Sequence, residues 1–185
     1  MITIKEINKN ELEAYGSIPF WYKTNKKYEI IKKNRGLEGL ELKLVDCKEF
    51  YKDFGSRVDS WLKTFDLSNW YFFAAYDEDK MIGGATLATK TNNCHMLEKR
   101  EDLALLWDLR ISDEYKHQGI GTKLFNIVKE FATKKGFKEL KVECQNTNPS
   151  AVNFYHKQGM HLDSINEHAY IDYPDEVQLL WYLDL

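Results

Sequence analysis

The 185-residue sequence lacks the features of a secreted or membrane protein. Its three cysteines, Cys47, Cys94 and Cys144, are widely spaced and form no C-x-x-C pair, which argues against a disulfide framework or a zinc ribbon. No apolar run approaches the length of a transmembrane helix, and the first residues, MITIKEINKN, alternate instead of forming the apolar core of a secretory signal. These absences predict a cytoplasmic protein with no membrane partner.

A large excess of positive charge is also lacking, because the formal net charge is -3 at pH 7. This balance disfavours a nucleic acid as the partner. One stretch, residues 23–36, holds six Lys or Arg against one acid, and it could form a phosphate-binding patch or a solvated face or loop. The acidic balance of the whole chain favours the solvated face or loop.

Metal-ligand spacing is absent from the five histidines, which are His95, His117, His156, His161 and His168. No two of them form an H-x-x-x-H or related pair, so the sequence predicts no catalytic metal. The unpaired cysteines add no further set of candidate ligands.

What the sequence does contain is a mixture of strand and helix patterns in an ordinary globular composition, 43% hydrophobic and 30% charged. Alternation or continuous apolar character predicts strands at 2–7, 70–76, 81–89, 103–111, 138–144, 161–170 and 176–185. Apolar residues three or four apart predict helices at 49–65, between Ile120 and Gly136, and at 148–159. The crossover helix makes 103–111 and 138–144 parallel. The predicted fold class is α/β, an α+β arrangement with a mixed central sheet.

Two glycines stand at the start of the second helix, in EYKHQGIGTKLF (114–125), where glycine costs about 1 kcal/mol relative to alanine. The backbone N–H groups of a first helical turn have no partner within the helix, and they bind phosphate oxygens well. The P-loop pattern G-x-x-x-x-G-K-[ST] is absent, and the dinucleotide pattern G-x-G-x-x-G does not fit, because its third glycine position holds Leu124.

The stretch KHQGIG (116–121) instead resembles the acyl-CoA loop of the GNAT N-acetyltransferases, [RQ]-x-x-G-x-[GA], with Lys116 in place of Arg or Gln. Further on, NPSAVNFYHKQGM (148–160) resembles the second signature of this family, N-x-x-A-x-x-[FL]-Y-x-x-x-G-F, with Met160 at the aromatic position. The closing LLWYLDL resembles the streptothricin acetyltransferase group, some of whose members confer antibiotic resistance.

This resemblance implies one GNAT domain over 1–185, with a variable acceptor-side half at 1–68 and an acetyl-CoA-binding core at 69–185. It implies two central parallel strands that splay apart, acetyl-CoA as the co-substrate, and a homodimer, which is common in the family. The implied acetyl-CoA contacts are Leu109, Arg110, Ile111, Lys116, His117, Gln118, Gly119, Ile120, Gly121, Thr122, Asn148, Ala151, Phe154 and Tyr155.

Three side chains are candidates for proton transfer during attack of an amine on the thioester. Asp108 interrupts an apolar strand, so it is either the general base or a substrate contact, or else it anchors a loop or pairs with Arg110. Glu143 is the second carboxylate, although alternation puts it on the side of Lys141, which favours a solvated face. The resemblance makes Tyr155 the acid that protonates the leaving thiolate, and Cys144 is expected to be buried packing rather than a nucleophile.

The acceptor predicted from this inventory is a small cationic amine, bound by the variable half, the strand of Asp108 and the segment before residue 176. Two alternatives stay open, which are acetylation of a protein lysine or N-terminus, and a non-catalytic acyl-CoA sensor. The acids expected near the acceptor are Glu98, Glu101, Asp102, Asp172, Asp175 and Glu176, and the expected aromatic walls are Trp21, Tyr22, Trp70 and Trp107.

Overall fold

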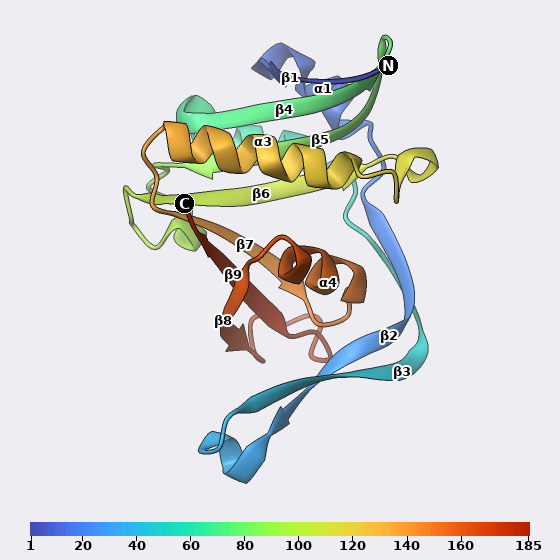
Figure 1. The fold of residues 1–185 in the computed structure, drawn as a ribbon, viewed down its shortest axis with the longest axis vertical. Coiled ribbons are helices and arrows are strands. Elements are labelled where there is room, and N and C mark those ends of the chain that lie inside the picture. The colour runs from blue at the N-terminus through green and yellow to red at the C-terminus, as the bar shows by residue number, and fades with distance from the viewer. The chain divides into compact units, whose positions relative to one another are not determined.

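The computed structural model describes residues 1–185, which divide into two compact units. Unit 1 contains residues 1–20, 54–142 and 183–185, and unit 2 contains residues 21–53 and 143–182. Figure 1 shows the elements of both units coloured along the chain. None of the helices has the length and apolar character that crossing a membrane requires.

Unit 1 is built on a mixed sheet in the order β1-β4-β5-β6-β7. Its strands are β1 (Ile2–Ile7), β4 (Trp70–Asp77), β5 (Lys80–Thr89), β6 (Leu103–Ile111) and the first part of β7 (Glu139–Gln145). Neighbouring strands are antiparallel, except that Leu103–Leu106 of β6 run parallel to Glu139–Val142 of β7. The predicted strands 70–76 and 81–89 form the antiparallel pair β4–β5, and the predicted parallel pair is confirmed.

Helices cover both faces of this sheet. Unit 1 contains α1 (Leu12–Gly16), α2 (Val58–Thr64) and α3 (Ile120–Lys134), and α3 lies along β4, β5 and β6 (Figure 1). Side chains of β4 point alternately to the two faces. Phe73 contacts Phe131 of α3, whereas Phe72 belongs to the core cluster that contains Tyr15 of α1 and Trp61 of α2. The apolar stripe predicted for the second helix is therefore its buried face.

Unit 2 combines a long hairpin with a short helix and two further strands. Its elements are β2 (Trp21–Lys32), β3 (Leu40–Asp53), the end of β7, α4 (Pro149–Lys157), β8 (His161–Asn166) and most of β9 (Gln178–Asp184). β2 pairs antiparallel with β3, and β8 pairs antiparallel with β9. Asn146 fastens the hairpin, because its amide donates to the Tyr28 carbonyl at 2.9 Å and its side-chain oxygen accepts from the Val177 N–H at 2.8 Å.

Five short 3-10 helices complete the two units. They are η1 (Lys9–Glu11), η2 (Lys33–Gly36), η3 (Leu67–Asn69), η4 (His95–Leu97) and η5 (Asp113–Tyr115). The last of these occupies the connection between β6 and α3, directly before the glycine loop.

The helix predicted over 49–65 is wrong for the first part of that range. β3 continues to Asp53, and α2 begins only at Val58, after Gly55 and Arg57 adopt positive φ angles of 63° and 55°. Two of the periodic aromatic residues pack across the hairpin and its base instead. Phe50 contacts Tyr22, and Phe54 stacks on Phe20 with 4.6 Å between ring centroids. Long-range strand pairing has overridden a local helical period.

The basic stretch 23–36 forms most of β2 and the turn after it. Its lysines pair with acids across the hairpin, including Lys23 with Glu49 at 2.8 Å and Lys33 with Glu41 at 3.0 Å. Each of these two lysine side chains is about half exposed. The solvated-face interpretation is therefore confirmed, on a strand rather than in a loop.

Candidate active site

The glycine loop leads from the end of β6 into α3. Gly119 is the N-cap of α3 with a φ of 78°, an angle that glycine adopts without the strain of other residues. A Cβ added at Gly119 would have no atom within 4 Å, so the space above the loop is open. The first-turn N–H groups of α3 have no acceptor within the helix. The loop thus combines unpaired donors, a helix N-terminus and free space, which suits a phosphate group.

Lys116 begins this loop and carries its positive charge. Its ammonium lies 2.6 Å from the carboxylate of Asp113, and its side chain is 35% exposed. The charge is therefore at the surface beside the loop and partly balanced by an acid.

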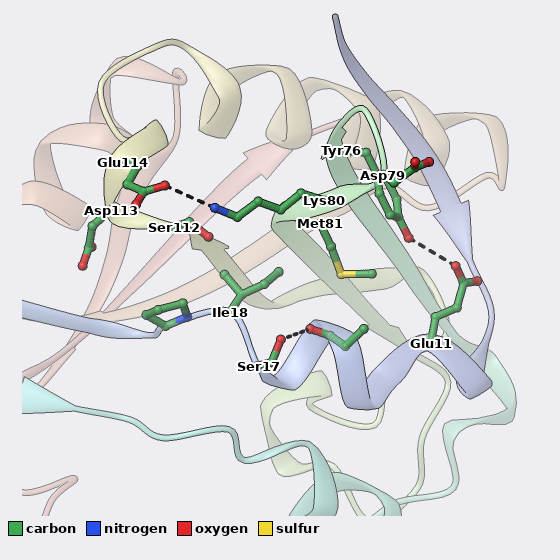
Figure 2. A pocket seen from close by; sticks show the side chains of 12 residues that line it. Glu11, Ser17, Ile18, Tyr76, Asp79, Lys80, Met81, Ser112, Asp113 and Glu114 are labelled. Carbon is green, nitrogen blue, oxygen red and sulfur yellow. Dashed lines mark hydrogen bonds and ion pairs between the residues drawn. The ribbon is translucent and has the colours of Figure 1, made fainter.

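An acid-lined pocket of about 570 Å³ lies next to the residues that precede the loop. Figure 2 shows Glu114 pairing with Lys80 and Tyr76 donating to Glu11 across it. Its lining residues are Glu11, Ala14, Ser17, Ile18, Pro19, Tyr76, Asp79, Lys80, Met81, Ser112, Asp113 and Glu114. None of the predicted catalytic residues is among them, and the dispersed acids gave no local pattern by which the pocket could have been predicted.

Asp108 lies in a buried ion pair inside unit 1. Its two oxygens accept from Arg110 at 2.8 and 2.6 Å, and Tyr15 donates to it at 2.7 Å. The side chains of Asp108 and Arg110 are 2% and 0% exposed. Burial, followed by the Asp108 charge, raises the pKa of Tyr15 well above its usual value, so that phenol remains a donor. The pairing with Arg110, one of the alternatives considered for Asp108, is present.

The Arg110 guanidinium also fixes the backbone where the chain leaves and re-enters unit 1. It donates to the carbonyls of Ile18 and Ser56, both at 3.3 Å. The rings of Tyr15, Phe20 and Trp61 surround it at 4.7 to 5.9 Å from their centroids. The side chain is therefore a core element, and any acetyl-CoA contact of Arg110 involves its main chain.

A β-bulge precedes Asp108 in β6. Thr86 of β5 pairs with Asp108, whereas its neighbour Leu87 pairs with Leu106, which leaves Trp107 as the extra residue. Bulges of this kind redirect side chains and are frequent beside active sites.

Glu143 sits in a polar cluster of unit 2. It accepts from the Tyr170 hydroxyl at 2.5 Å and from the Gln178 amide at 2.7 Å, and Gln145 donates to Tyr170 at 3.1 Å. Burial, and then the Glu143 charge, raise the pKa of Tyr170. No sequence pattern indicated Tyr170 or Gln178, because both reach Glu143 from distant positions in the chain.

The solvated face predicted for Lys141 and Glu143 is therefore wrong. Lys141 is 2% exposed in its side chain and pairs with Glu98 at 2.5 Å, while its ammonium also donates to the Met96 carbonyl at 3.0 Å. Partners from outside the strand bury Lys141 and partly cover Glu143.

The second motif forms α4 and its N-terminal cap. The Asn148 side chain accepts from the Ala151 N–H at 3.1 Å, and Pro149 occupies the first turn. Tyr155 is buried on this helix, with its ring 5.4 Å from that of Phe154. Cys144 is buried as predicted, and burial raises its pKa to about 12, which keeps it a thiol.

The residues expected near the acceptor differ in how far their side chains are buried. Among the six acids, Glu176 is buried at 2% exposure and the other five are exposed. Trp70 and Trp107 pack together in unit 1 at 5.2 Å between centroids, and Tyr22 of unit 2 bonds to Thr147 at 2.9 Å.

Residues 40–160 match the model of the acetyltransferase (GNAT) family. The chain belongs to the GNAT family. This confirms the family predicted from the two motifs, and with it the enzyme class and the mixed α/β fold. The matched range includes the glycine loop, α3, β7 and α4 of this GNAT protein.

The relatives of this chain include two kinds of acetyltransferase. Streptothricin acetyltransferase A of Bacillus subtilis is 28% identical over 112 residues, and the match spans 60% of each chain. N-alpha-acetyltransferase 30 of Schizosaccharomyces pombe is 26% identical over 140 residues, which are 70% of this GNAT chain and 90% of that protein. A putative streptothricin acetyltransferase of Bacillus anthracis, solved with acetyl coenzyme A, has the same fold, with a TM-score of 0.80, 20% identity and full coverage of both chains.

Proposed function

We propose that this GNAT protein transfers an acetyl group from acetyl-CoA to a primary amine of a small cationic molecule. The observation that carries the proposal is the open glycine loop at the N-terminus of α3, where Gly119 has a positive φ and free space above it. The match of the family model over residues 40–160 and the bacterial relatives named for streptothricin support the same reaction.

Acetyl-CoA supplies a reactive acetyl thioester, and the chain supplies its binding. We assign the pyrophosphate to the backbone of His117 through Thr122, with Lys116 adding charge, and the pantetheine arm to the main chain of Leu109, Arg110 and Ile111. The family resemblance extends the contacts to Asn148, Ala151, Phe154 and Tyr155 of α4. These assignments need mainly backbone groups, so the buried Arg110 side chain is compatible with them.

A carboxylate must accept a proton from the amine, whose pKa in water is about 10. Glu143 suits this role better than Asp108. Both oxygens of Asp108 are held by Arg110, which compensates its charge. The donors to Glu143 are the neutral side chains of Tyr170 and Gln178, so its negative charge is available to a cationic acceptor.

Tyr155 is the proposed acid, because it occupies the tyrosine position of the second motif at the buried face of α4. We predict that Tyr155→Phe lowers kcat at least about tenfold, since it removes one proton donor, while the Kd for acetyl-CoA changes little. Stopped-flow thiol release and calorimetry measure the two quantities. Val152→Ala serves as a control for packing on the same helix, because Val152 is buried on α4 and is not among the proposed contacts. An unchanged kcat in Tyr155→Phe would remove Tyr155 from the mechanism.

The second candidate function is acetylation of a protein N-terminus, and the match to the N-alpha-acetyltransferase 30 of Schizosaccharomyces pombe favours it. A thiol-release assay with a panel of acceptors separates the two. The panel contains streptothricin, spermidine, an aminoglycoside and short peptides with free N-termini. We expect turnover of the small cations. Turnover of the peptides alone would contradict the small-cation proposal and support N-terminal acetylation of a protein. Acetyl-CoA binding without any turnover would favour a non-catalytic sensor.

A further inference from the structure

One buried carboxylate of unit 2 has an oxygen without a partner. Glu176 is 2% exposed, and its Oε2 accepts from the ammonium of Lys52. Its Oε1 is buried and has no hydrogen bond. Buried carboxylate oxygens are normally satisfied, and each one that is not calls for an explanation, such as a role in binding. Oε1 is therefore available to a donor that is not part of the chain.

The charges around Glu176 favour a positively charged donor. We call Glu143, Glu176, Lys52, Tyr22 and Tyr170 the carboxylate–tyrosine cluster. Burial raises the pKa of Tyr170 most, and the negative charges of Glu143 and then Glu176 raise it further. Burial and the charge of Glu176 likewise raise the pKa of Tyr22. With one lysine against two carboxylates, and neutral donors on Glu143, the cluster carries one excess negative charge.

The aromatic rings near Glu176 already contact an ammonium group. The Lys52 ammonium lies 4.5 Å from the ring centroid of Tyr173 and 5.7 Å from that of Tyr170. Cation–π contacts of this kind are typical of sites that recognise organic ammonium ions. Residues 171–175 are exposed, so Glu176 is buried directly next to a surface segment.

We propose that Glu176 is a recognition residue for the acceptor, with Oε1 accepting a hydrogen bond from a primary ammonium group. The inference rests on the proposed function for its substrate class, and it narrows that class. An ammonium held by a carboxylate stays protonated and cannot attack a thioester. The acceptor therefore carries at least two amino groups, of which one is held by Glu176 and another reacts.

The two partners of the Lys52–Glu176 pair give a test with opposite signs. Glu176→Gln removes the negative charge, and we expect it to raise the Kd for a cationic amine at least about tenfold, the effect of losing one charge-assisted hydrogen bond. Lys52→Met removes a competing cation, and we expect it to lower the same Kd. If the ion pair were purely structural, Glu176→Gln and Lys52→Met would both raise the Kd for the amine. Calorimetry with streptothricin and with spermidine measures both effects without requiring turnover.

Glu167→Gln is the matched control, because Glu167 forms a surface pair with Lys32 in the same unit. The Kd of this variant for streptothricin and spermidine should equal that of the wild type. If Glu176→Gln does not fold, the double variant Lys52→Met with Glu176→Gln removes both charges together and should still bind the amines more weakly than wild type. The inference is overturned if wild type binds neither probe, if the Glu176 variant that folds binds as wild type does, or if Lys52→Met weakens binding. A bound amine that is never acetylated would contradict the proposed function instead.

Discussion

Arg110 is a fully buried arginine whose guanidinium joins three segments of unit 1. It neutralises Asp108 on its own strand and donates to the carbonyls of Ile18 and Ser56. Residues 20 and 54 mark the points where the chain leaves this unit for the β2–β3 hairpin and returns. The side chain thus holds both ends of the hairpin's connection in place.

We predict that Arg110→Met lowers the free energy of unfolding by about 3–5 kcal/mol, because it leaves the Asp108 carboxylate buried without a cation. Urea denaturation followed by fluorescence measures the change. Combining Arg110→Met with Asp108→Leu should restore part of the loss, since no charge then remains buried.

Lys134→Met provides the control for this prediction. Lys134 and Glu130 form an exposed pair on α3, with side chains 79% and 66% exposed, and such pairs contribute little. The free energy of unfolding of the Lys134→Met variant should stay close to that of wild type. An equal loss in Lys134→Met and Arg110→Met would contradict the account of the buried pair.

At the scale of elements, α3 offers two glycines that differ only in position. Gly119 precedes the helix and Gly136 follows it, with φ angles of 78° and 84°, and neither has an atom within 4 Å of an added Cβ. Alanine at either position therefore costs the same kind of backbone strain, about 1–2 kcal/mol. The two sites differ in that the proposed pyrophosphate contact involves Gly119.

We predict that Gly119→Ala raises the Kd for acetyl-CoA at least about tenfold, because a methyl group would occupy the space of a phosphate oxygen and tilt the N–H donors. Gly136→Ala should leave this Kd unchanged, although it should lower the thermal midpoint of unfolding as much as Gly119→Ala does. Calorimetry and thermal unfolding of both variants provide the comparison. Equal acetyl-CoA affinity in the two variants would exclude the loop as the phosphate site.

The elements predictable from the sequence were those with a strong local signal. Alternation in ITIKEI, the apolar run 103–111 and the cap of Asn148 placed β1, β6 and α4 to within one or two residues. The helix predicted over 49–65 is wrong in its first part, because Phe50 and Phe54 have helical spacing but pack on Tyr22 in β2 and on Phe20 before it. Pairing across the chain decided that structure.

For the candidate site, the sequence predicted the loop and the tyrosine of α4, because both are carried by contiguous motifs. It could not predict the partners that set the charge of each carboxylate. Tyr15 lies 93 residues from Asp108, and Gln178 lies 35 residues from Glu143. It also gave no means of distinguishing Glu176 from the exposed acids Asp172 and Asp175, since burial of that side chain follows from the fold.

At the scale of the whole molecule, we propose that the acetyl group passes directly from acetyl-CoA to the amine without an acetylated enzyme. Two of the three cysteines agree with this, because Cys94 and Cys144 are buried and burial raises the pKa of both thiols. Neither is therefore suited to act as a thiolate nucleophile.

The most direct measurement is mass spectrometry of a quenched reaction containing the protein, acetyl-CoA and streptothricin, which reports on the small molecule and the intact protein together. We predict that streptothricin gains one acetyl group and that the protein mass stays unchanged at every time point, including in mixtures without the amine. Unmodified streptothricin, or an acetylated protein that forms before the product, would contradict it.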